Sequence, residues 1–310
     1  MINIIDVAYV RYRAPDLDVM EGFLRDFGML PSARANDALY MRGLGKAHHI
    51  HITERGEAAA LGFGVWVASH GDLDKAAAEF GVKVEDNPEP GGGKRVRLTD
   101  PAGFVVDLLH GQQELEPIPH RPPTDVNFAE GSRLRQSTPI RLEPAPAHVM
   151  RLGHVVLMAE DHMPLYDFYR RLFGLKVSDG YYHGTPENRV AFFMHLNSES
   201  NWVDHHAIAV IKSPDGKTRF DHTAFEVLDI DDVFQGHAYL EERQHRLSWG
   251  VGRHVEGSQV FDYWRDPWGH KIEHWTDGDL VNNHYPEQYF ELNMESLAQW
   301  APPLTPAFFE

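Results

Sequence analysis

Two histidines and one glutamate stand in β-rich segments of the second half of this 310-residue chain, namely His154, His222 and Glu273. If the three strands face a common concave side, two imidazoles and one carboxylate occupy one face of a metal ion and leave its other positions open. That donor set suits Fe(II) oxygen chemistry, and Mn(II) accepts the same ligands. The three residues are therefore the candidate metal ligands.

Each of these residues, taken alone, also fits an ordinary place on a half-buried strand. A buried carboxylate without a partner is costly, which favours a bound cation beside Glu273. Two further ionisable residues lie close in the sequence. Glu226 shares a strand face with His222, four residues on, and is the weaker ligand candidate. Strand alternation turns His274 away from the face of Glu273, so we expect a structural role for it.

The chain repeats itself, and the repeat identifies the strands that carry the candidate ligands. An apolar strand, an acidic turn and a helix ending in Phe-Gly occur at 5–28 and again at 152–174, with an offset of 146 (174 − 28). Asp-Pro-x-Gly followed by an apolar strand occurs at 100–107 and again at 266–273. Because motifs at both ends of the first half are repeated in the second half, we predict an α+β fold of four βαβββ modules, paired into two similar domains.

The same offsets place residues of the first half opposite each candidate ligand, and the counterparts of the two histidines cannot bind a metal. We therefore expect one metal per chain, in the second half only. The counterparts are Ala8 for His154, Leu61 or Gly62 for His222, and Asp107 for Glu273.

Repeats and composition together divide the chain into four parts. Residues 1–113 are expected to form a metal-free domain, and 114–148 a proline-rich linker or strap. Residues 149–280 should form the domain with the metal site. Residues 281–310 form an aromatic-rich tail, and its apolar end predicts docking onto the body of the protein.

Composition excludes several classes of function. Acidic residues outnumber basic ones by 46 to 29, and the net charge of −17 opposes binding to nucleic acid. Cysteine is absent, which excludes disulfides, thiolate metal sites and cysteine nucleophiles. The sequence contains no apolar run of about 18 residues, so we expect no membrane span. The first residues carry no secretory signal, so we expect a cytoplasmic protein.

The sequence resembles the type I extradiol dioxygenases of the vicinal oxygen chelate superfamily, the relatives of catechol 2,3-dioxygenase. The resemblance extends over nearly the whole chain, and its specific motifs are four segments of the second half. The most specific segment places His254, Tyr263 and Glu273 at spacings of 9 (263 − 254) and 10 (273 − 263). The four segments are Leu152–Leu157, Asp204–Val210, Asp221–Phe225 and Gly252–Glu273.

The resemblance implies insertion of both atoms of O2 into a substituted catechol next to the diol, giving a hydroxymuconic semialdehyde-type product. It implies Fe(II), with Mn(II) possible, on the three candidate ligands, and a homo-oligomer. It implies that His206 is the acid/base group near O2, because the family's histidine is followed by two residues and then an alanine, as His206 is followed by Ala207, Ile208 and Ala209. Tyr263 and His254 would hydrogen-bond the substrate oxygens. His205, the neighbour of His206, is expected to point to the opposite face.

Two other classes of function stay open. One is another enzyme of the same fold, such as a glyoxalase-like isomerase, an epimerase or a hydroxyphenylpyruvate-type dioxygenase. Isomerases of the glyoxalase kind usually assemble the metal site from both modules of a pair, whereas all three ligand candidates here lie in the second half. The other class is a metal-free protein that binds aromatic compounds, which would leave the His/His/Glu set without a purpose.

Overall fold

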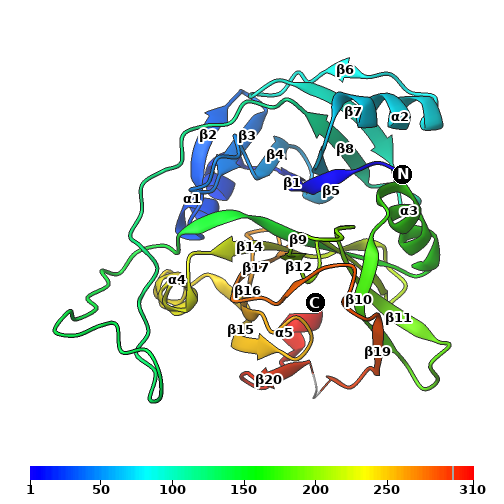
Figure 1. Ribbon diagram of the computed structural model, residues 1–310. Coiled ribbons are helices and arrows are strands. Elements are labelled where there is room, and N and C mark those ends of the chain that lie inside the picture. The colour runs from blue at the N-terminus through cyan, green and yellow to red at the C-terminus, as the bar shows by residue number, and fades with distance from the viewer. Residues whose placement is uncertain (295–296) are drawn as a thin grey trace.

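The computed structural model describes residues 1–294 and 297–310. Two mixed β-sheets form the two halves of the molecule, and each is built from two βαβββ modules, as the repeat predicted (Figure 1). One large hydrophobic core contains buried residues of both halves. No helix among the described residues is long and apolar enough to cross a membrane.

The first half contains eight strands in the order β2-β3-β4-β1-β5-β8-β7-β6. Its first module consists of β1 (Ile4–Ala14), α1 (Leu17–Asp26), β2 (Leu30–Arg34), β3 (Ala38–Arg42) and β4 (His51–Arg55). Its second module consists of β5 (Ala59–Val67), α2 (His70–Phe80), β6 (Glu85–Asp86), β7 (Lys94–Thr99) and β8 (Val105–His110).

The second half has a sheet of ten strands in the order β19-β10-β11-β13-β9-β14-β17-β16-β15-β20. Its first module consists of β9 (Val149–Ala159), α3 (Met163–Phe173), β10 (Lys176–Tyr182), β11 (Arg189–His195) and β13 (Ile208–Lys212). The short strand β12 (Val203–Asp204) lies between β11 and β13 in the chain and pairs with β18 (Leu280–Val281) in a separate two-stranded sheet. Its second module consists of β14 (Arg219–Val227), α4 (Ile230–Glu242), β15 (Arg246–His254), β16 (Val260–Arg265) and β17 (Lys271–Thr276).

The centres of the two sheets have the same pairing. The first strands of the two modules pair antiparallel, β1 with β5 and β9 with β14. Each first strand also pairs in parallel with the last strand of its own module, as β14 does with β17. Because the strands at the centre belong to both modules, side chains from either module can meet on one face of the sheet.

The strand register corrects one alignment made from the sequence. β1 and β9 both have eleven residues and correspond at an offset of 145 (159 − 14), whereas α1 and α3 correspond at 146. The turn before α3 is one residue longer than the turn before α1. Tyr9, and not Ala8, therefore occupies the position of His154: Tyr9 pairs with Gly64 as His154 pairs with Ala224.

The linker between the halves has no regular secondary structure and runs along one side of the molecule (Figure 1). Arg121 fastens it to the start of α4 through ion pairs of 2.7 Å with Asp229 and with Asp232. The tail, expected to dock, packs against the second half through Leu297, Ala298, Ala301, Leu304 and Phe308. Its elements are β18 (Leu280–Val281), β19 (Gln288–Glu291), β20 (Ala298–Trp300) and α5 (Pro306–Phe309). The exact domain boundaries and the homo-oligomer stay predictions.

Candidate metal centre

His154, His222 and Glu273 converge in the second half, as the sequence predicted. One nitrogen of each imidazole and one carboxylate oxygen lie within 4.8 Å of one another. All three residues are buried, and Glu273 has no exposed surface. Three donors gathered so closely inside the protein form a group that can hold one metal ion.

Strand register brings the three donors together. Ala224 of β14 stands between His154 of β9 and Glu273 of β17 and pairs with both of them. His222 lies two residues before Ala224 and so shares its face of the sheet. Gly153, next to the first ligand, leaves room for Trp275, because a Cβ at this glycine would lie 2.4 Å from the indole ring.

The surroundings of the Glu273 carboxylate suit a bound cation. Its Oε2 atom lies 3.3 Å from Nε2 of His154 and 3.3 Å from Nε2 of His222. Neither contact has hydrogen-bond geometry, and both carboxylate oxygens lack a hydrogen-bond partner among the described residues. Burial alone would raise the pKa of Glu273, but the two histidines hold that pKa below its ordinary value. Donors that face a common point, rather than one another, suit a metal.

One ligand has a carboxylate behind it. Nδ1 of His222 donates to Oδ2 of Asp221 at 2.6 Å, which leaves Nε2 free to bind a metal. Lys271 holds the other side of this carboxylate, with its Nζ 3.1 Å from Oδ1. A carboxylate behind a ligating histidine fixes the tautomer and the orientation of the ring. Sequence reasoning quoted Asp221 within a motif but gave it no role.

His206 lies beside the ligands and lines the cavity. Its ring centroid is 4.2 Å from that of His154, and it is 5.2 Å from the ring of Phe193. Burial holds the pKa of His206 well below that of an ordinary imidazole, so the ring is neutral near pH 7. A neutral imidazole here can accept a proton or donate one.

His205 does not point away from His206, contrary to the expectation. The two residues lie in a bend between β12 and β13, where the alternation of a strand does not apply. Nδ1 of His205 is 3.1 Å from Nδ1 of His206, and His205 is almost completely buried.

His254 and Tyr263 form the other wall of the site. Nδ1 of His254 donates to the carbonyl oxygen of Leu297 at 2.9 Å, so its Nε2 accepts from the Tyr263 hydroxyl, also at 2.9 Å. Burial lowers the pKa of His254 to about 4 and raises that of Tyr263 well above its ordinary value. Both groups therefore stay neutral near pH 7, and a ligand oxygen can hydrogen-bond His254 or the tyrosine proton in exchange for the bond that joins the two side chains.

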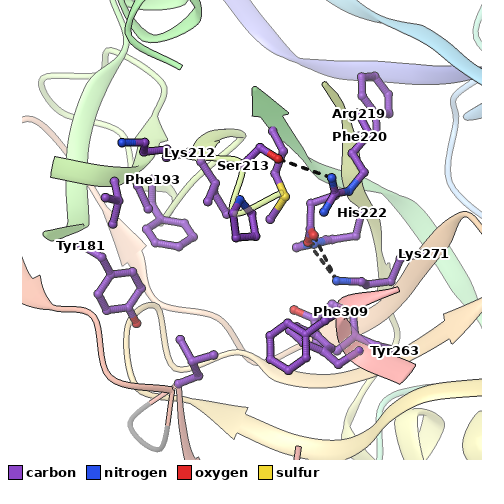
Figure 2. A pocket seen from close by; sticks show the side chains of 18 of the residues that line it. Tyr181, Phe193, Lys212, Ser213, Arg219, Phe220, His222, Tyr263, Lys271 and Phe309 are labelled. Atoms are coloured by element: carbon purple, nitrogen blue, oxygen red, sulfur yellow. Dashed lines mark hydrogen bonds and ion pairs between the residues drawn. The ribbon is translucent and has the colours of Figure 1, made fainter. Parts of the chain in front are cut away.

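A cavity of about 890 Å³ opens at the candidate ligands and extends between the second sheet and the tail. Figure 2 shows Tyr181 and Phe193 on one side of it, and Lys271, Tyr263 and Phe309 on the other. The ring of Phe308 lies under Nζ of Lys271, at 3.8 Å. The tail therefore covers part of the site, and most of the cavity wall is apolar.

The weaker candidates lie outside the group of ligands. Nε2 of His274 is 2.7 Å from the carbonyl oxygen of Phe27, which is a structural contact between the halves, as expected. Glu226 accepts a hydrogen bond of 2.6 Å from Arg151. Neither side chain belongs to the cluster that could hold a metal.

Comparisons with known proteins agree with this geometry. The sequence model of the "Glyoxalase/Bleomycin resistance protein/Dioxygenase superfamily" matches residues 151–274. Metapyrocatechase 2 of Cupriavidus necator is 29% identical over 299 residues, which is 95% of this chain and 88% of that protein. Homoprotocatechuate 2,3-dioxygenase of Brevibacterium fuscum, solved in complex with 3,4-dihydroxyphenylacetate, has a TM-score of 0.80 at 21% identity, covering 99% and 92% of the two chains. The Mn(II)-bound glyoxalase of Novosphingobium aromaticivorans has a TM-score of 0.77 at 21% identity, covering 100% and 98%.

Proposed function

Since this chain belongs to the glyoxalase/bleomycin resistance protein/dioxygenase superfamily, in its extradiol ring-cleaving branch, we propose that it is an Fe(II)-dependent dioxygenase acting on a substituted catechol. One O2 adds to one catechol, and the ring bond next to the diol breaks. Both oxygen atoms end in a hydroxymuconic semialdehyde-type product. The ring supplies all four electrons, so the reaction needs no other reductant.

The observation that carries this proposal is the convergence of His154, His222 and Glu273 on one point, where the two histidines line a large, mostly apolar cavity. The similarity to metapyrocatechase 2, which extends over nearly both chains, supports the same reaction class. The three donors come from both modules of the second half, His154 from β9 and the other two from β14 and β17, so the similarity to metapyrocatechase 2 is what favours a dioxygenase over a glyoxalase-like isomerase. We propose Fe(II) as the metal, with Mn(II) as the alternative that the same donors accept.

Fe(II) on these three residues would supply Lewis acidity toward the catechol hydroxyls and open positions at which substrate and O2 meet. The protein's own groups do the rest. Tyr263 and His254, already hydrogen-bonded to each other, orient the substrate oxygens. The apolar walls and the tail exclude water, which strengthens each of these hydrogen bonds.

His206 is the group that we propose for proton transfer. Its Nδ1 is engaged by His205, so Nε2 is the atom that can hold or release a proton in the cavity. A neutral imidazole at this place can accept a proton from the substrate and return it during ring opening.

The test is anaerobic reconstitution with Fe(II), followed by exposure to air with a panel of catechols. We expect yellow ring-cleavage products, with one O2 consumed per catechol opened. A protein that holds iron but consumes no O2 with any catechol would contradict the proposal. Tight binding of catechols without iron would instead support a metal-free binding protein.

A further inference from the structure

His206 is joined by hydrogen bonds to two more buried polar residues, His205 and then Asp179. Oδ2 of Asp179 is 2.7 Å from Nε2 of His205, and Nδ1 of His205 is 3.1 Å from Nδ1 of His206. At most 5% of any of the three residues is exposed. His206 lines the cavity, whereas the other two do not. A carboxylate and an imidazole thus support the proposed acid/base group from behind.

A bulge in β10 allows this contact. The pairing of β10 with β11 shifts between Val177 and Asp179, so that Ser178 is the extra residue. Ser178 Oγ donates to the carbonyl oxygen of His205 at 2.5 Å, while Asp179 bonds the His205 ring. Consecutive strand residues normally face opposite sides, but a bulge can turn two neighbours toward the same group. Ser178 therefore fixes the backbone of His205, and Asp179 fixes its ring.

The order of donors follows from the carboxylate. An ionised Asp179 only accepts hydrogen bonds, so Nε2 of His205 must carry a proton. A neutral imidazole has one donor nitrogen and one acceptor nitrogen, so a His205 with its single proton on Nε2 offers Nδ1 as an acceptor for the Nδ1 proton of His206. Nε2 of His206 then presents its lone pair to the cavity.

We propose that Asp179 and His205 are positioning residues, which hold His206 in one orientation and in the Nδ1-protonated tautomer. The catalytic consequence rests on the proposed function, in which His206 transfers a proton. Neither residue touches the substrate. Their contribution is to prevent His206 from rotating or from placing its only proton on Nε2.

The first half contains an internal comparison for this arrangement. His48 and His49 stand where His205 and His206 stand in the second half, at an offset of 157, with their Nδ1 atoms 3.2 Å apart. The bulge is also repeated, since the β2–β3 pairing shifts between Pro31 and Ala33 as the β10–β11 pairing shifts between Val177 and Asp179. Ala33 thus occupies the place of Asp179. The histidine pair is thus present in both halves, whereas the carboxylate of the second half is replaced by an alanine in the first.

The first readout is the tautomer of His206 in metal-free protein labelled with ¹⁵N-histidine. Long-range ¹H–¹⁵N spectra distinguish protonated from unprotonated ring nitrogens, and the His206→Asn spectrum identifies the signals. We expect Nδ1 of His206 to be protonated and Nε2 unprotonated in the wild type. In Asp179→Asn, which removes the charge, the two tautomers should mix. A wild type with protonated Nε2, or unchanged His206 signals in Asp179→Asn, would overturn the proposal.

The second readout is turnover of the iron-loaded enzyme. In Asp179→Asn we expect kcat to fall by about 10²-fold, the lower end of what general acid–base catalysis contributes, with iron content and the KM for catechol unchanged. Asp232→Asn is the matched control, because Asp232 is a buried carboxylate that contacts His148 at 3.0 Å and does not line the cavity. It should lose stability and keep its kcat.

His205→Asn serves as the second variant if Asp179→Asn does not fold, and it should lower kcat in the same way. Values of kcat within about three-fold of the wild type in either folded variant would contradict the positioning role. The tautomer measurement needs no turnover. A wild type that is inactive toward every catechol therefore overturns the proposed function, whereas an unchanged His206 spectrum overturns the positioning.

Discussion

The two halves place different side chains at the same positions of the same sheet. Strand pairing matches each candidate ligand, and Tyr263 as well, with a residue of the first half. The matched pairs are Tyr9 with His154, Gly62 with His222, Asp107 with Glu273, and Arg97 with Tyr263.

Both halves bury a carboxylate at the centre of the sheet, but they neutralise it differently. Arg97 bonds both oxygens of Asp107, at 2.7 and 2.8 Å, and the Tyr9 hydroxyl donates at 2.8 Å. Arg11 adds an ion pair of 3.3 Å. Among the residues that the structure describes, no lysine or arginine pairs with Glu273, and two imidazole nitrogens face it instead. A buried charge needs a partner. In the first half, Arg97 and Arg11 supply the positive charge beside Asp107. In the second half, a metal ion would supply it beside Glu273.

The first half is also closed to a metal by its backbone. Gly62 occupies the position of His222, and a Cβ there would lie 2.0 Å from the carbonyl oxygen of Val105. No ligand side chain fits at this position unless β8 moves. The first half therefore differs in three ways. Tyr9 replaces the ligand His154, the backbone at Gly62 leaves no room for a counterpart of His222, and Arg97 neutralises the buried carboxylate in place of a metal ion.

The largest effect should follow from removing a ligand of the second half. In His222→Ala we expect iron to be lost on desalting and turnover to disappear, because two protein donors no longer form the triad. The fold should survive, as circular dichroism can show. Iron analysis and O2 consumption measure the result, and normal values of both would exclude His222 from the site.

His206→Asn should keep iron and still bind catechol. Asparagine retains hydrogen-bonding ability but cannot exchange a proton near neutral pH. General acid–base catalysis is typically worth about 10²–10⁴-fold, so turnover should fall on that scale, as stopped-flow O2 kinetics would show. Loss of iron would instead make His206 a ligand or a structural support.

Asp221→Asn should weaken metal binding without abolishing it. Loss of the group behind a ligating histidine typically costs 10- to 100-fold in metal affinity, and competition with a chelator would measure this. Glu226→Gln is the control on the same strand, because Glu226 bonds Arg151 and not a ligand. Equal affinities in the two variants would remove Asp221 from the metal centre.

Asp107→Asn should change stability and leave iron content and turnover alone. Breaking a buried ion pair from one side typically costs about 3–5 kcal/mol. Although burial alone would raise the pKa of Asp107, Arg97 holds it below the ordinary value. Its stabilisation is therefore present above about pH 3.9 and is lost as pH falls below that value. The stability difference between wild type and variant, measured by urea unfolding, should shrink in the same pH range. A loss of iron in this variant would contradict the claim that the metal site lies in the second half alone.

The duplicated fold and the three ligands could be predicted from the sequence because strands, Asp-Pro-x-Gly turns and motif spacings are local signals. The exact match between the halves could not. The turn before α3 is one residue longer than the turn before α1, so an offset taken from the helices misplaced the counterpart of His154. The pair His48–His49 lies at a third offset, in an irregular segment, and was not recognised as a repeat.

Residues behind the ligands depend on tertiary structure that no local pattern shows. Asp179 reaches His205 only because β10 contains a bulge, and 26 residues separate the two. Alternation misassigned His205 because its segment is a bend and not a strand. Asp221 was within reach of prediction, since a carboxylate next to a ligating histidine is a recurring arrangement around metals.

Diffraction data collected at the iron absorption edge from crystals grown anaerobically with Fe(II) test the central claim most directly. The account predicts one anomalous peak per chain, within bonding distance of His154, His222 and Glu273, and none beside Asp107. A peak at Asp107, or iron bound elsewhere with the three residues unoccupied, would contradict it.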